Sequence, residues 1–175
     1  MTLQRIRQFL AAITASVTDD DRSYVNNWLQ ADEQKLFWQM NLPDQCHALQ
    51  VAYTAASLAE NQPDIDRRLL IRCALLHDVG KRKGDVSTVD KIITVLAHAA
   101  APDWASRWGR QGRGGPWQNV RHAFFIYFHH ASLSAQMLTD LNLHQEAAVV
   151  ARHHKAPADS DPPELVILRQ ADDLN

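Results

Sequence analysis

The sequence has few cysteines, no long apolar run and no excess of charge of one sign. Two cysteines in 175 residues are too few for a disulfide framework, so we expect a protein of the reducing cytoplasm. No apolar run approaches the roughly 20 residues needed to cross a bilayer, so no membrane partner is expected. Eighteen basic against twenty acidic side chains are too balanced for general nucleic-acid binding.

The amino-terminal stretch lacks the pattern of a secretion signal. Apolar residues recur there at spacings of three and four between Leu3 and Val17, and Thr14 and Ser16 interrupt the stretch. This pattern predicts an amphipathic helix, and secretion is not expected.

Strand signals are scarce, whereas helix start signals recur along the chain. Alternation of apolar and polar residues hardly occurs, and capping residues and first-turn prolines precede most of the apolar stretches. We therefore expect an all-α fold in a single domain, which a chain of 175 residues can form. The expected helices begin after Thr18, Pro43, Pro63, Ser87, Trp117 and Pro162, and those from Pro43 and Pro63 end near Glu60 and Gly80.

One segment contains no acidic residue. No Asp or Glu occurs from Trp104 to Thr139. The stretch from Pro102 to Trp117 holds four of the six glycines and three of the five tryptophans, and it predicts a long loop. A long loop in a small domain is usually functional or mobile, although a solvated loop is an equal alternative.

Histidines and aspartates recur on the apolar faces of the expected helices. Residues at i, i+3, i+4 and i+7 meet on one face, which turns these polar groups toward the core. A lone histidine there is more often a hydrogen-bonded core residue, but a buried carboxylate such as Asp78 needs a cation or strong donors. One bound metal ion explains the set better than unrelated accidents. The other inward residues are His47, His77, His130, His153 and Asp172.

The residue types indicate which metal ions would bind. Imidazole and carboxylate without thiolate suit iron, manganese, zinc, cobalt or nickel. His77 and Asp78 are about 100° apart on a helix, so both reach one site only if the helix end lies against it. Gly80 is expected to end the helix there, which leaves a metal face open, as a catalytic site requires.

The order His47, His77-Asp78, Asp172 resembles the H…HD…D signature of the HD superfamily of metal-dependent phosphohydrolases. Residues 75–81 resemble the family's L-L-H-D-I-G-K. Four further segments resemble family motifs in the right order, namely 46–55, 130–135 (with Ser134 where the family has Gly), 150–154 and 168–174. The resemblance covers residues 43–175 and implies an HD domain there. Residues 1–42 are then expected to form helices that cap this core or provide a dimer face.

The resemblance implies a helical bundle with two divalent transition metals between its helices, iron or manganese being favoured over zinc, cobalt and nickel. Lys81 matches a family lysine that contacts the scissile phosphate, although it could also be a plain helix C-terminal cation. His129 and His154 stay open as alternatives to their neighbours, and His154, Arg110 and Arg113 are further candidate substrate contacts. By position, the first metal would be held by His47, His77, Asp78 and Asp172, and the second by His130 and His153, with Asp78 bridging.

The implied activity is hydrolysis of a small nucleotide or related phosphoester by attack of a metal-bound water, with Asp78 and Lys81 as catalytic residues. The chain lacks the Gly-Tyr-Pro motif of cyclic-di-GMP phosphodiesterases and is far shorter than the guanosine tetraphosphate synthetase-hydrolases. It is similar to small stand-alone bacterial members, including those that split symmetrical dinucleoside tetraphosphates, but has His153-His154 where these have His-Thr. Two alternatives stay open: a di-iron oxygenase, and a non-catalytic metal or nucleotide sensor. A homodimer is also left open.

Overall fold

The computed structural model describes residues 16–175, so the helix expected between Leu3 and Val17 lies largely outside the described residues. The all-α prediction is confirmed: within the described part, the only β pairing is an isolated bridge between Met40 and Arg82. The helices are α2 (Asp19–Trp28), α3 (Ala31–Trp38), α4 (Leu42–Leu58), α5 (Arg67–Leu76), α6 (Thr88–Ala100), α7 (Pro102–Trp108), α8 (Pro116–Asp140), α9 (His144–Val150) and α10 (Pro163–Leu174).

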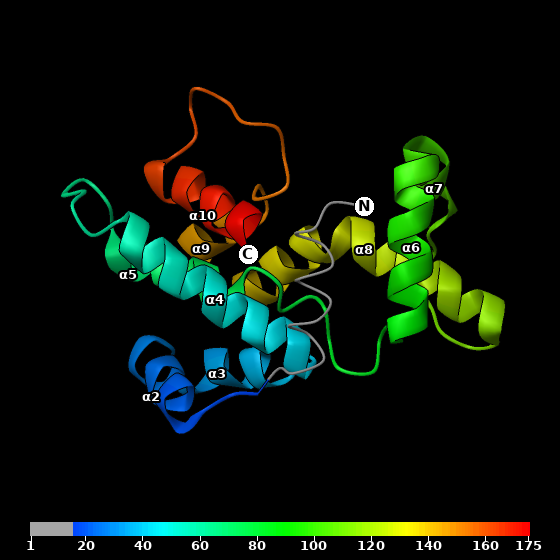
Figure 1. The fold of residues 1–175 in the computed structure, drawn as a ribbon, viewed down its shortest axis with the longest axis horizontal. Coiled ribbons are helices and arrows are strands. Elements are labelled where there is room, and N and C mark those ends of the chain that lie inside the picture. The colour runs from blue at the N-terminus through cyan, green and yellow to red at the C-terminus, as the bar shows by residue number, and fades with distance from the viewer. Residues whose placement is uncertain (1–15) are drawn as a thin grey trace.

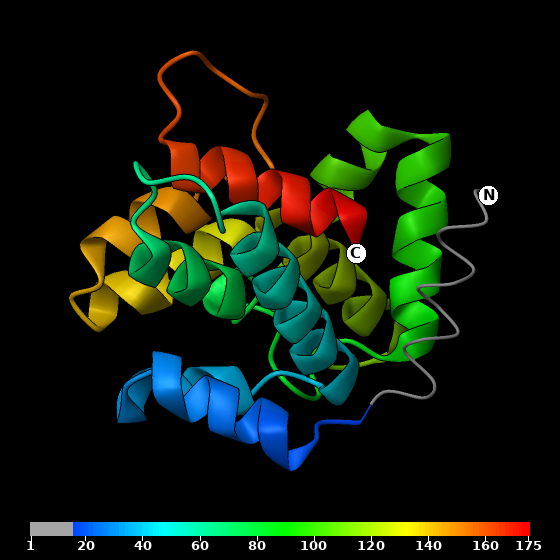
Figure 2. The same ribbon diagram turned by 60° about the vertical axis from the view of Figure 1, so that its left-hand side comes forward.

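Helix α5 lies at the centre of the main body. It packs against α4, α9 and α10, and α2 and α3 also pack against it (Figures 1 and 2). From Leu70 to Leu76 every residue except Arg72 is buried, so the helix is apolar nearly all round, as a core helix must be. The last residues of α5 therefore lead directly into the interior of the protein.

Side-chain capping explains the starts of α2, α5 and α6. The Thr18 hydroxyl accepts from the Asp21 N–H (3.1 Å) and the Asp21 carboxylate accepts from the Thr18 N–H (2.9 Å), as predicted. Ser87 caps α6 in the same way, by accepting from the Asp90 N–H. The start predicted at Pro63 is wrong, because Asp66 is the residue whose carboxylate caps α5, accepting from the Leu69 N–H (3.0 Å).

The predicted loop from Pro102 to Trp117 is half wrong. Its first half is helix α7, and only residues 109–115 lack regular structure. The rings of Trp104 and Trp108 stack at 5.2 Å, and both meet Phe124 of α8 edge-on. These contacts stabilise a short helix that the glycine content obscures. Helices α6, α7 and the first part of α8 pack together to one side of the body (Figure 1).

A buried ion cluster connects three helices of the body. The guanidinium of Arg72 on α5 donates to both carboxylate oxygens of Glu33 on α3, at 3.2 and 2.7 Å. It also forms an ion pair with Glu146 on α9. All three side chains are at most 13% exposed, so each charge depends on the others for solvation.

The end of α5 approaches α8 more closely than a side chain would allow. A Cβ added at Gly80 would lie 2.6 Å from the carbonyl oxygen of His130 and 3.0 Å from the backbone nitrogen of Ser134. The Gly80 N–H donates to the Ser134 hydroxyl at 2.9 Å. Ser134, which stands where the motif that this segment resembles has glycine, therefore supplies a hydrogen bond between the two segments.

We expect Gly80→Ala to lower the free energy of unfolding by about 2 kcal/mol, because backbone atoms cannot move aside as flexible side chains do. Urea denaturation would measure the loss. Gly115 is the control, because a Cβ there meets no atom nearer than 3.9 Å. Gly115→Ala should cost less than about 1 kcal/mol, through its capping position alone. Equal effects of the two substitutions would contradict the close contact as the cause.

Candidate metal centre

The six residues predicted as metal ligands come together in the structure, although they are far apart in the chain. His47 lies on α4, and His77 and Asp78 follow directly after the last residue of α5. The others are His130 on α8, His153 in the turn after α9, and Asp172 on α10. Five segments thus converge on one interior region.

Their donor atoms form three overlapping groups, in each of which all atoms lie within 4.8 Å of one another. His77 belongs to two of the groups, and so does His153. The groups are His47, His77 and Asp78; then His77, His153 and Asp172; then His130, His153 and His154.

Asp78 lies between the two ends of this cluster. Its Oδ2 atom is 3.5 Å from Nε2 of His77 and 2.6 Å from Nζ of Lys81. Its Oδ1 atom faces the other way and is 3.4 Å from Nε2 of His130. Because the carboxylate is almost completely buried, each oxygen interacts with protein groups rather than with water.

Three histidine rings are oriented by their own backbone. Nδ1 of His77 donates to the Ala74 carbonyl (2.8 Å), and Nδ1 of His130 donates to the Tyr127 carbonyl (2.8 Å). His153 bonds the Val150 carbonyl in the same way, at 2.7 Å. A carbonyl oxygen can only accept, so each Nδ1 carries a proton, and in the neutral ring Nε2 then offers its lone pair to the interior. This is the orientation that metal-binding imidazoles adopt.

The buried acceptors in this region lack donors. Oδ1 of Asp78 and Nε2 of His153 are buried without any hydrogen-bond partner. Nε2 of His77, with its lone pair, faces the carboxylate oxygens of both Asp78 and Asp172, the latter at 3.7 Å. Acceptors that face acceptors in a buried site are costly. A divalent cation among them would satisfy them all, so the residues present fit a metal.

Burial and nearby charges together set the protonation states that a metal requires. Burial lowers the pKa of His153 to about 3 and, together with the charge of Lys81, holds the pKa of His130 well below its usual value. Burial alone would raise the pKa of Asp78, but positive charge nearby, with Lys81 the largest contributor, outweighs it and the pKa is lowered. Neutral imidazoles and an ionised carboxylate are the forms that bind metals.

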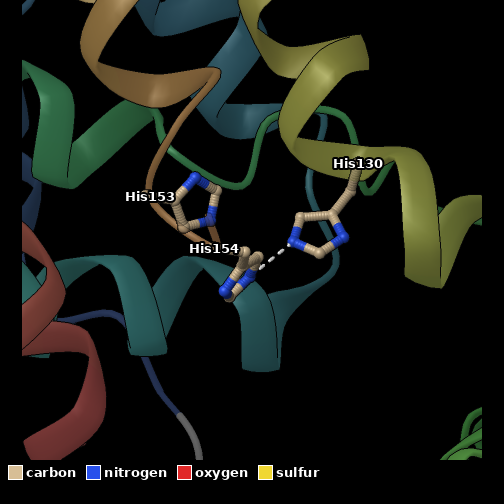
Figure 3. Close-up of side chains that lie close together, drawn as sticks. All are labelled: His130, His153 and His154. Carbon is tan, nitrogen blue, oxygen red and sulfur yellow. Dashed lines mark hydrogen bonds between the residues drawn. The ribbon is translucent and has the colours of Figure 1, made fainter. Parts of the chain in front are cut away.

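The structure distinguishes the neighbouring histidines. His130 is buried in the cluster, whereas His129 is exposed, with its ring 4.6 Å from that of Phe125. His154 is more exposed than His153, yet its Nε2 lies 2.9 Å from Nε2 of His130 (Figure 3). His153 and His154 therefore both reach the same end of the cluster, whereas the sequence predicted that only one of the two would be a ligand.

The other end of the cluster is closed by a hydrogen bond between distant helices. Nε2 of His47 lies 2.9 Å from Oδ1 of Asp172, 125 residues further along the chain.

A family model for the HD domain matches residues 45–175, three quarters of the chain, and the four signature residues lie within that match. The chain belongs to the HD domain family. No curated protein and no solved structure matches it.

The HD domain is characteristic of a superfamily of metal-dependent phosphohydrolases, whose members generally are hydrolases. In this HD domain, the histidine and aspartate groups could hold a metal ion. Within residues 16–175, no helix has both the length and the apolarity needed to span a bilayer.

A pocket of about 180 Å³ lies against the Lys81 side of the HD cluster. Two of its residues, Ile126 and Tyr127, lie one turn before His130 on α8. Sequence analysis missed this pocket, because nothing marks isolated residues of four segments as neighbours before the chain is folded. It is lined by Asn41, Asp44, Lys81, Arg82, Val86, Thr94, Val95, Ala123, Ile126 and Tyr127.

The two loop arginines predicted as substrate contacts lie on the exposed 109–115 segment. Arg113 reaches toward the loop after the HD motif, where its Nη1 lies 4.0 Å from the place of a Cβ on Gly84. Among the described residues, no hydrogen bond or ion pair joins the Arg110 or Arg113 guanidinium to the cluster. Lys81 is the cation that the structure places there.

Proposed function

We propose that this protein hydrolyses a small nucleotide or a related phosphoester at a metal centre held by the HD residues. The buried acceptors that face one another without donors support the metal centre most directly. Asp78 of this centre contacts the ammonium group of Lys81, a residue that also lines a pocket, and a cation at that place supports a phosphorylated substrate.

Two divalent transition metal ions would account for the arrangement, with iron or manganese favoured. His47, His77, Asp78 and Asp172 would hold the first. His130, His153 and His154 would hold the second, and Asp78 presents one oxygen to each end. When bound, such ions lower the pKa of a coordinated water and neutralise charge on phosphoryl oxygens.

Lys81 is the residue that would meet the phosphate. Its ammonium group lies 2.6 Å from Asp78, and the residue also lines the pocket, so Lys81 lies where the cluster and the pocket meet. Burial alone would lower the pKa of Lys81, but the carboxylates of Asp78 and Asp44 outweigh it and raise the pKa. The lysine therefore stays charged and can attract a phosphoryl oxygen and hold it beside the metal ligands.

The pocket would take the organic part of the substrate. Val86, Val95, Ala123 and Ile126 give it apolar walls, and Tyr127 adds an aromatic ring. Its volume of about 180 Å³ is small beside the 300–1,000 Å³ typical of drug-sized ligands. It suits one base or sugar ring better than both nucleosides of a dinucleotide.

The test is hydrolysis of a phosphoester panel by protein loaded with iron or manganese, beside chelator-treated protein. We expect release of phosphate or of a nucleotide only with metal, and faster turnover of nucleoside monophosphates than of methyl phosphate. Turnover that requires oxygen would indicate the di-iron oxygenase instead. Tight nucleotide binding without turnover in metal-loaded protein would indicate the sensor.

A substitution in the pocket should separate substrate binding from metal binding. Val95→Trp would fill the space beside Thr94 and Tyr127, and we expect it to raise KM for a nucleoside monophosphate about tenfold. Metal content and hydrolysis of methyl phosphate should not change, because neither needs that space. An unchanged KM for the nucleotide would mean that its organic part binds elsewhere.

A further inference from the structure

Helix α6 turns its apolar face outward. Val89, Ile92, Ile93 and Leu96 follow one another at the spacing of a single helix face, and all four are exposed. Val89 is 64% exposed and Leu96 55%. An amphipathic helix of a water-soluble domain normally buries such a stripe. We call these four residues the α6 face.

The opposite side of α6 packs against α8. Thr94 is only 1% exposed, and its hydroxyl donates to the Asp90 carbonyl at 2.8 Å. Nδ1 of His98 lies 2.8 Å from the hydroxyl of Tyr127 on α8. Thr94 and Tyr127 also line the pocket. The inner side of α6 is therefore occupied, and turning the helix to bury the α6 face would break the contact of His98 with Tyr127 and expose Thr94.

Helices α6, α7 and the first part of α8, together with the segment 109–115, form an arm at one side of the body. Aromatic and basic side chains are exposed on this arm. Trp104 on α7 and Trp117 on α8 are 52% and 76% exposed, although both helices pack together with α6 (Figure 1). Arg107, Arg110 and Arg113 are also exposed. Residues 86–139 carry five basic and two acidic side chains, whereas the whole chain has a net charge of −2.

We propose that the α6 face, with Trp104, Trp117 and the nearby arginines, docks on an anionic lipid surface. Exposed aliphatic residues on one helix face, together with exposed tryptophans and arginines on the segments packed with it, have the composition of elements that lie in the membrane interface. Contact with lipid would bury the four aliphatic side chains and bring the arginines to phosphate headgroups. Such a helix lies on the bilayer and does not span it.

Two other occupants fit less well. A second copy of the chain placed on the α6 face would bring the same arginines near one another, which opposes association. Single-stranded nucleic acid would stack on the tryptophans but would leave the aliphatic stripe in water. The sequence predicts no membrane partner, because no apolar run is long enough to cross a bilayer, but that reason does not bear on a helix that lies on the surface.

Vesicle flotation of the metal-loaded full chain tests the proposal. The vesicles are made of phosphatidylcholine alone, or of phosphatidylcholine mixed with phosphatidylglycerol. We expect binding to the anionic vesicles and much weaker binding to the neutral ones. Ile92→Glu with Leu96→Glu should weaken binding about 30-fold or more. Arg107→Gln should weaken it about fivefold.

Val166→Gln is the matched control, because Val166 is 51% exposed on α10, away from the arm, and should leave binding unchanged. Quenching of wild-type tryptophan fluorescence by brominated lipid gives a second readout that needs no variant. Absence of both binding and quenching would overturn the proposal. So would a dimer in sedimentation without lipid that Ile92→Glu disrupts, or a loss of thermal stability in that variant, which would indicate cover by the segment from Leu3 to Val17.

Discussion

Asp78→Asn is expected to leave the protein folded, without bound metal, and at least about 1000-fold less active toward any phosphoester that the wild type hydrolyses. Asp78 directs one oxygen toward His77 and the other toward His130, so its carboxylate presents one oxygen to each end of the cluster. Asparagine has nearly the same shape but removes the negative charge. The ammonium of Lys81, 2.6 Å from the carboxylate, would then repel an incoming cation.

Elemental analysis of metal per chain, beside a hydrolysis assay, measures this prediction. His130→Ala should remove the metal at its own end, whereas His129→Ala should keep wild-type metal content, because His129 is exposed beside Phe125. About one metal per chain, lost in His77→Ala and kept in His130→Ala, would indicate a mononuclear site. Full metal content in Asp78→Asn would contradict the central position of this carboxylate.

Arg72→Met is expected to lower the free energy of unfolding by about 4 kcal/mol without changing the metal ligands. The substitution leaves the carboxylates of Glu33 and Glu146 buried, close together and without their cation. Two like charges that water cannot reach repel each other and lose the hydrogen bonds of the guanidinium. Because Arg72 connects α5 to α3 and α9, the substitution destabilises the helices that hold the metal ligands.

Guanidinium denaturation would measure this cost, and Lys35→Met is the matched control. Lys35 pairs with Asp32 at 2.6 Å, but their side chains are 71% and 67% exposed, so its loss should cost less than about 0.5 kcal/mol. The triple substitution Arg72→Met, Glu33→Gln, Glu146→Gln should recover much of the stability, because no buried charge remains unpaired. If Arg72→Met alone lowered the free energy of unfolding as little as Lys35→Met, water would have to reach the buried carboxylates of Glu33 and Glu146.

Local signals predicted most helices but not how they are oriented. Thr18 and Ser87 cap helices as expected because a cap depends only on residues within one turn. The start of α5 was misplaced because Pro63 and Asp66 both carry start signals, and only Asp66 makes the capping bond. Helix α7 was missed because packing of Trp104 and Trp108 on Phe124 overrides the glycine-rich context.

The candidate ligands could be named from the sequence because their periodicity and their family motifs coincide. What the pattern could not supply was the three-dimensional relation among distant segments. His154 reaches His130 through a turn whose path no periodicity encodes. The pocket beside Lys81 joins residues from four segments, and the outward face of α6 depends on its contacts with Tyr127.

The bonds between the histidine rings and their own backbone have a consequence for how the protein meets metal ions in a cell. The Nδ1 atom donates to the backbone carbonyl three residues earlier in each of His77, His130 and His153. Their rings therefore keep their orientation when no ion is bound. Such a site can release one ion and accept another without unfolding. We therefore expect the supply of ions around the folded protein, weighed by their order of affinity, to decide which metal it carries. Growth in a medium poor in one metal would then yield the same fold with a different ion.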